Sequence, residues 1–89
     1  MSIDINGIKN DIRSAMSRYT GIQIEDDSKN LFSNDYHPII PNYLYVIKAI
    51  EEKYGTVVYR VIETSDFSIF TVNQLSEAIA RALMGNNEL

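Results

Sequence analysis

Residues 34–43, NDYHPIIPNY, place two adjacent isoleucines between two prolines, directly before a segment with apolar residues at helical spacing. Proline is favoured at the first position of a helix, because the N–H group that it lacks would have no partner there. Proline also biases the residue before it away from helical backbone angles. The sequence therefore predicts a helix over residues 41–54 that begins at Pro41 and ends at Gly55. Its predicted buried face comprises Tyr43, Val46, Ile47, Ile50 and Tyr54.

An amphipathic helix is also predicted before this segment, over residues 3–20. Ser2 or Asp4 is expected to cap its start, and Gly21 to end it. The long connection over residues 21–40 is polar, but it contains apolar residues spaced as anchors that could hold it against a core. These anchors are Ile22, Ile24, Leu31 and Phe32.

The last helix is predicted over residues 72–84. Thr71 and Gln74 match a capping box, in which the threonine and glutamine side chains satisfy each other's free backbone N–H groups. Residues 56–63, TVVYRVIE, are rich in β-branched side chains, which favour a strand. Because no second strand-like run is present, these residues are expected to form an extended connection into a short helical turn over residues 63–69.

These elements predict an all-α protein with three main helices, one short helix and a long first loop. One domain over residues 1–89 is expected, since 89 residues is the size of a single small domain. Five side chains are expected to meet in its core: Tyr19, Ile47, Ile50, Leu75 and Ile79.

Composition excludes several classes of function. The chain has no cysteine, so disulfides, thiolate metal sites and cysteine nucleophiles are excluded. Its net charge of −4 disfavours binding to nucleic acid or an anionic membrane and suits partners with basic patches. No apolar run approaches the ~20 residues of a membrane helix, and the first residues do not resemble a signal peptide. A cytoplasmic monomer is therefore expected.

No motif indicates catalysis or a metal site. Asp26, Ser28 and Asn30 resemble the start of a calcium loop, but Leu31 and His37 stand where that loop needs glycine and glutamate. His37 is the single histidine and lacks a nucleophile or metal-ligand companion at a defined spacing. There is also no glycine-rich phosphate loop. We therefore expect no catalytic residue, no metal site and no enzymatic activity.

From about Ile8 to Leu83 the chain resembles the acyl carrier and peptidyl carrier protein family. The resemblance implies a bundle of three main helices and one short helix. It also implies a serine at the start of the second helix that carries phosphopantetheine. Four segments carry it: MSRYTGIQI at 16–24, SKNLF at 28–32, VIKAIEEKYG at 46–55 and DFSIFTVNQL at 66–75.

The chain departs from the family pattern at the attachment serine. Counting from the neighbouring motifs puts that position at Ile39 or Ile40, and no serine lies between Ser33 and Ser65. The resemblance therefore implies a carrier-like module without a prosthetic group. It is similar to carrier-related proteins that lack the serine and accompany bacterial peptide-modification enzymes.

Such a module would dock a biosynthetic or peptide-modifying enzyme, or its peptide, through the second helix. Glu51 and Glu52 match acidic positions that dock basic partners in the family, and an outward Tyr45 suits a contact surface. The predicted docking residues are thus Ile39, Ile40, Tyr45, Glu51 and Glu52.

Two alternatives stay open. The chain could be an authentic acyl or peptidyl carrier that bears phosphopantetheine on a displaced serine. Ser33, which follows Leu31 and Phe32, is the candidate attachment residue in that case. An unrelated helical bundle is the other alternative.

Overall fold

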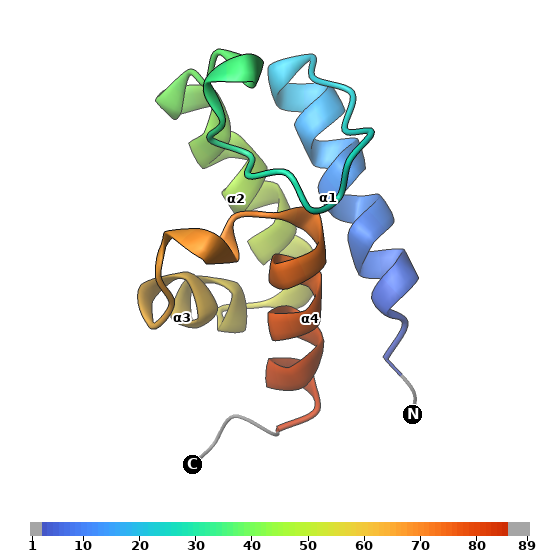
Figure 1. Ribbon diagram of the computed structural model, residues 1–89. Helices are drawn as coiled ribbons and strands as arrows, with labels where there is room; N and C mark the ends of the chain where they lie inside the picture. Colours follow the sequence, from blue (N-terminus) through green and yellow to red (C-terminus); the bar gives the residue numbers. More distant parts are fainter. Residues whose placement is uncertain (1–2, 86–89) are drawn as a thin grey trace.

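The computed structural model describes residues 3–85, which form an all-helical structure without a strand in that range (Figure 1). The predicted fold class, all-α, is therefore confirmed. The elements are α1 (Ile5–Thr20), η1 (Asn34–Tyr36), α2 (Ile40–Tyr54), α3 (Val57–Glu63), η2 (Phe67–Ile69) and α4 (Val72–Leu83), where η denotes a 3₁₀ turn.

α1 packs against both α2 and α4, and α3 fills the remaining side between α2 and α4. In Figure 1, α1 and α2 lie side by side, while the shorter α3 lies beside α4 on the side away from α1. α1 begins at Ile5, two residues later than predicted, after an extended Asp4 whose side chain makes no capping bond. The alternative cap, Ser2, lies outside the described residues. Gly21 ends the helix in the left-handed conformation, as glycine does without strain.

The second helix begins one residue earlier than predicted. Ile39 is the extended residue before the helix, Ile40 is its first helical residue, and Pro41 is its second. The early start costs no hydrogen bond, because the first four N–H groups of any helix lack partners within it. The backbone carbonyl of Ile39 accepts hydrogen bonds from the N–H groups of Asn42 (3.0 Å) and Tyr43 (3.3 Å). Gly55 closes the helix as predicted.

The prediction of an extended connection over residues 56–63 is wrong, because Val57–Glu63 is the helix α3. Val58 and Val61 lie three positions apart, so a helix turns both into the core, where they are almost completely buried. A strand would point successive side chains to opposite faces and would have no neighbour to pair with. Burial therefore overrides the β-propensity of this segment. The separate turn η2 follows α3. The turn predicted over residues 63–69 therefore includes η2 and the last residue of α3, and the main short helix lies before it.

The predicted core is largely confirmed. Ile50, Leu75 and Ile79 are buried in one cluster with Ile8, Ile12 and Met16 of α1. Ile47 is only partly buried and packs at the edge of that cluster. Tyr19 was wrongly assigned to the core, because its side chain is 37% exposed. It lies in the last turn of α1 and stacks on Tyr45 of α2, with ring centroids 6.1 Å apart.

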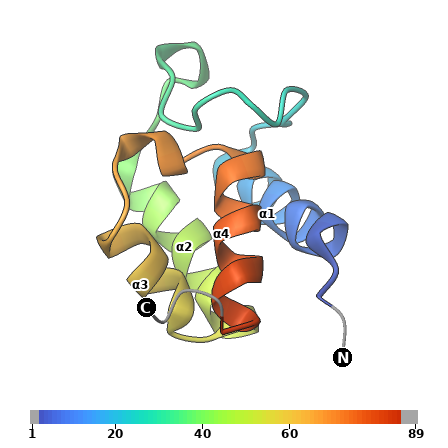
Figure 2. The same ribbon diagram turned by 60° about the horizontal axis from the view of Figure 1, so that its bottom comes forward.

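The long first loop runs across one end of the bundle, at the top of Figure 2. Its predicted anchors are confirmed: Leu31 is buried, and Ile22, Ile24 and Phe32 pack against the core. Hydrogen bonds add to this packing. The Leu31 N–H group donates to the Phe70 carbonyl (2.7 Å), and the Tyr43 hydroxyl donates to the Leu31 carbonyl.

The loop also joins the start of α4 to α1. The Asn73 N–H group donates to the Asp27 carbonyl at 3.0 Å, while the Asp27 carboxylate accepts two hydrogen bonds from Arg13. At the same end of α4, the Thr71 hydroxyl accepts a hydrogen bond from the Gln74 N–H group at 2.9 Å. The threonine half of the predicted capping box is therefore present.

Candidate functional site

The start of α2 presents apolar side chains to solvent. Ile39, Ile40, Leu44 and Tyr45 are each between 55% and 61% exposed. Ile40 and Leu44 are four residues apart and share one face of the helix, and Tyr45 follows directly on the side that faces Tyr19. We call these four residues the apolar patch. Exposed apolar side chains are common singly, but a group of four within two helical turns is typical of a contact surface.

Sequence reasoning found three of these four residues and missed Leu44. The signal that could have found it is its spacing from Ile40, since positions four apart on a helix lie on the same face. Ile39 and Ile40 were predicted to be docking residues, and both side chains are exposed.

The two predicted acidic docking residues lie further along the same helix. Glu52 is twelve residues after Ile40, or about 18 Å along the helix axis. It forms an exposed ion pair with Lys48 at 3.8 Å, and Glu51 is partly buried. The structure thus brings Ile39, Ile40 and Tyr45 together and leaves Glu51 and Glu52 at the other end of α2. Lys48 partly neutralises the charge of Glu52 at that end of the helix.

Ser33, the alternative attachment residue, is separated from α2 by the turn η1. It is the residue before that turn, and its hydroxyl accepts a hydrogen bond from the Asp35 N–H group at 3.3 Å. Asp35 forms an ion pair with Lys29 at 2.7 Å, and the hydrogen bond from Lys29 lowers the pKa of the Asp35 carboxyl. Ser33 therefore caps a short turn in the loop rather than standing at the start of the second helix.

The polar residues of the first loop make structural hydrogen bonds. The Asp26 carboxylate accepts bonds from the Ser28 N–H group (3.0 Å) and hydroxyl (2.7 Å), which lower the pKa of Asp26. The Asn30 side chain donates to the Phe67 carbonyl at 3.1 Å. His37 is exposed and adopts a positive φ of 50° at the end of η1. Within residues 3–85, no group of three or more histidine and acidic side chains is placed to hold a metal ion.

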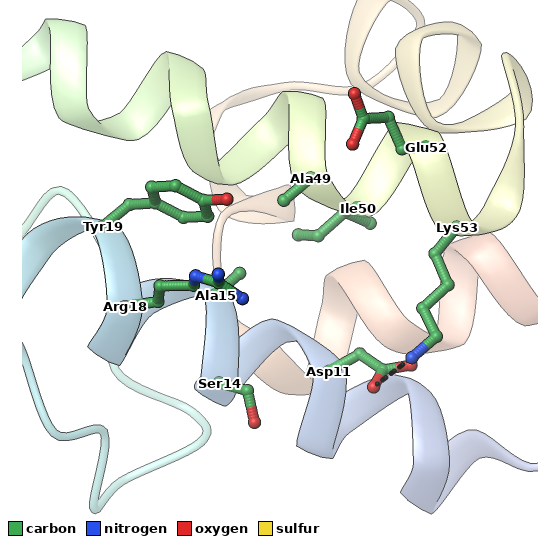
Figure 3. Close-up of a pocket in the computed structure, with 9 residues that line it drawn as sticks. All are labelled: Asp11, Ser14, Ala15, Arg18, Tyr19, Ala49, Ile50, Glu52 and Lys53. Atoms are coloured by element: carbon green, nitrogen blue, oxygen red, sulfur yellow. Dashed lines mark hydrogen bonds and ion pairs between the residues drawn. The ribbon is translucent and has the colours of Figure 1, made fainter.

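A cleft of about 290 Å³ between α1 and α2 adjoins the apolar patch (Figure 3). Ala15, Ala49 and Ile50 form its apolar floor, because two alanines face each other where the helices meet. Arg18 extends along α1 toward Ala15, and Tyr19 reaches toward α2 at one end (Figure 3).

At the other end of the cleft, side-chain hydrogen bonds connect α2 to α1. Lys53 of α2 donates to the Asp11 carboxylate at 3.1 Å, and the Tyr54 hydroxyl donates to the same carboxylate. Burial, together with this hydrogen bond, raises the pKa of the Tyr54 phenol. Glu52 also lines the cleft, but its carboxylate points away from α1 (Figure 3). Sequence reasoning missed this cleft, because no motif marks two alanines that face each other across a helix pair.

The chain matches no known protein family, no curated protein and no solved structure. In the part of the chain that the structure describes, no helix is both long and apolar enough to cross a membrane.

Proposed function

We propose that this chain is an acyl-carrier-protein-like, non-catalytic module that docks a partner through the start of α2. The partner would be a biosynthetic or peptide-modifying enzyme, or its peptide, and no phosphopantetheine arm would take part. The order of the helices, with a long first loop and a short third helix, supports the carrier-like part of this proposal.

The observation that carries the proposal is the apolar patch. Where the resemblance implies a modified serine, this chain exposes Ile39 and Ile40, with Leu44 and Tyr45 on the next turn. An isoleucine side chain has no nucleophile to receive a phosphopantetheine group. It does contribute apolar area, the largest favourable term in most protein association. The position is therefore suited to contact and not to covalent attachment.

The patch is the size of a transient contact. The largest apolar patch on a typical monomer covers roughly 300–600 Å², and four half-exposed side chains fall within that range. A stable complex of standard size buries about 800 Å² per partner. The patch alone therefore supports reversible docking, with the rest of α2 at its rim.

Site-specific crosslinking tests the docking surface. A photoreactive amino acid at Leu44 should give a discrete adduct in an extract of the source organism, whereas the same group at Tyr59 should not. Tyr59 is the matched control, because it is an exposed aromatic residue on α3. Unlabelled protein should compete for the adduct, and the Leu44→Asp variant should compete poorly. The same adducts from both positions would contradict docking through α2.

Intact-mass measurement tests the alternative with an arm on Ser33. Purified protein is incubated with coenzyme A and a broad-specificity phosphopantetheinyl transferase. The expected result is no change in mass, because Ser33 caps η1 and does not stand at the start of α2. A gain of one phosphopantetheine unit that disappears in Ser33→Ala would establish an authentic carrier with a relocated arm.

A further inference from the structure

We propose that Asn6 is a site of spontaneous deamidation, because the first turn of α1 leaves the backbone nitrogen of Gly7 free to attack its side chain. This nitrogen bonds to the side-chain carbon Cγ of Asn6 and loses its proton, and the bond from Cγ to Nδ2 breaks as ammonia leaves. Water then opens the resulting cyclic imide at either carbonyl, which gives aspartate or isoaspartate at position 6. The inference is independent of the proposed docking function, because it involves neither α2 nor a partner.

Asn6 differs from the other asparagines in the residue that follows it. Among the asparagines of this chain, only Asn6 precedes a glycine. A side chain at the following position hinders attack by the backbone nitrogen and restricts the rotation that brings this nitrogen to Cγ. Glycine lacks both constraints, because it has no Cβ atom. The step from Asn6 to Gly7 therefore has the lowest intrinsic barrier to imide formation in the chain.

The first turn of α1 leaves the attacking nitrogen without a hydrogen bond. Gly7 is the third residue of α1, and the first N–H groups of a helix have no partner within it. Asp4, the residue before the helix, supplies no substitute, because its side chain makes no capping bond. The Ile8 N–H group is the first in this helix to donate, to the Asp4 carbonyl at 3.1 Å. Among residues 3–85, the Gly7 N–H group has no acceptor.

The reacting groups are accessible to water, and the turn that holds them opens at low cost. Asn6 is exposed and Gly7 is partly exposed. The helical backbone keeps the Gly7 nitrogen away from Cγ, so Asn6 has to leave the helical conformation before it reacts. That rotation releases only the residues before it: Ile3 loses a partial contact with the core, while Ile8, the first buried residue of α1, stays in place. Helix ends open locally at a small fraction of the cost of global unfolding.

Asn73 occupies the same place in another helix and is held more firmly. It is the second residue of α4, as Asn6 is of α1. The next backbone nitrogen, that of Gln74, donates to the Thr71 hydroxyl at 2.9 Å. The Asn73 N–H group also donates to the Asp27 carbonyl at 3.0 Å. The start of α4 is therefore capped and anchored, whereas the start of α1 has neither contact in the described part of the chain.

The two products would change α1 in opposite directions. The first turn of α1 contains no acidic residue. Aspartate at position 6 would place a carboxylate there, where it interacts favourably with the positive end of the helix dipole. Isoaspartate would instead add a methylene group to the main chain and disrupt the hydrogen bonds of that turn. Aged protein should therefore contain two species that are both more acidic than the parent and differ in the order of the first turn.

Peptide mapping by mass spectrometry tests the proposal on the intact chain. Protein is aged in mildly alkaline buffer, folded in one series and unfolded in guanidinium chloride in the other, and loss of the amide is followed at each asparagine. We expect the rate at Asn6 in the folded chain to lie within about tenfold of its rate in the unfolded chain, because opening of a helix end costs little. Asn73 should remain intact in the folded chain. An isoaspartyl methyltransferase should label the aged sample but not the fresh one.

Two variants separate the dipeptide from its structural setting. Gly7→Ala should slow the loss at Asn6 severalfold in both series; the atoms nearest to the added Cβ belong to the flexible Asp4 side chain, from 3.1 Å. Gln74→Gly creates a second asparagine–glycine step at the same helix position, and Gln74 is exposed. In the folded variant, Asn73 should react about tenfold more slowly than Asn6, because the hydrogen bond to Thr71 holds the attacking nitrogen. In the unfolded variant, the two asparagines should react alike.

Two results would overturn the proposal. The first is an Asn6 amide that persists in the folded chain while the unfolded chain loses it, which would show that the first turn of α1 protects this residue. The second is an equal rate at Asn6 and Asn73 in folded Gln74→Gly, which would show that a free backbone nitrogen is not the deciding feature. The comparison of folded with unfolded protein needs no variant, so it decides the question even if Gln74→Gly does not fold.

Discussion

Replacement of Tyr43 by phenylalanine should loosen the first loop while leaving the helices in place. Tyr43 is buried on α2, and its hydroxyl donates a hydrogen bond to the carbonyl of Leu31 in the loop. Its ring packs on Phe32, with centroids 4.6 Å apart. The Tyr43→Phe variant keeps this ring contact and removes only the hydrogen bond. It therefore isolates the contribution of this one hydrogen bond to holding the loop.

The size of the effect follows from what the missing hydroxyl leaves behind. The Leu31 carbonyl loses a buried donor, and an unsatisfied buried polar group costs about 1–3 kcal/mol. A domain of this length has a total stability of about 4–13 kcal/mol, estimated from ~0.05–0.15 kcal/mol per residue. We therefore expect Tyr43→Phe to lower the free energy of unfolding by about 1–2 kcal/mol. The midpoint of thermal unfolding should fall by roughly 4–16 °C.

Urea unfolding followed by far-ultraviolet circular dichroism measures this difference directly, since the protein is all-helical over residues 3–85. Tyr45→Phe is the matched control, because Tyr45 is exposed and its hydroxyl makes no hydrogen bond in that range. The control should change stability by less than about 0.5 kcal/mol. Hydrogen exchange at the Leu31 amide, which donates to Phe70, should accelerate in Tyr43→Phe. If Tyr43→Phe is as stable as the control, the Tyr43 hydroxyl does not help to hold the loop and the reasoning fails.

Three further outcomes follow from the structure. Ile50→Ala should cost about 2–5 kcal/mol in urea unfolding, and Ile47→Ala clearly less, because only Ile50 is fully within the core; equal costs would contradict the assigned packing. Burial raises the pKa of Tyr54 above its ordinary value of 10.0, so the stability that the neutral phenol contributes is complete below pH 10 and is lost as the pH rises further. In Tyr54→Phe, the free energy of unfolding should therefore fall less steeply above pH 10. The hydrogen bond from Arg13 lowers the pKa of Asp27 below its ordinary value of 3.8, so the stability that the Asp27 carboxylate contributes is complete above that pH and is lost in stronger acid. In a pH series of unfolding curves, Arg13→Gln should lose less stability in acid than the unmodified protein.

The candidate site could be predicted in part. Two prolines around Ile39 and Ile40 mark a helix start, and the resemblance suggested these two residues as docking residues. Their exposure came from the structure. Leu44 was not predicted, because a helical pattern with apolar residues on adjacent faces does not reveal which of them a neighbouring helix covers.

Local chemistry was sufficient for the ends of the helices and the anchors of the loop. Gly21 and Gly55 close helices because glycine accepts a positive φ, and Thr71 opens one because its hydroxyl binds a free N–H group. Leu31 holds the loop because an apolar side chain gains free energy wherever it is buried.

Only the tertiary structure decided the state of residues 57–63 and the place of Tyr19. The β-branched run of α3 is helical because the helix buries Val58 and Val61 between α2 and α4, and that gain exceeds a local propensity of at most about 1 kcal/mol per residue. Tyr19 continues the apolar pattern of α1, yet it leaves the core and stacks on Tyr45, because it lies in the last turn of its helix. Spacing along one helix defines a face, but the packing of the other helices determines which part of that face is buried.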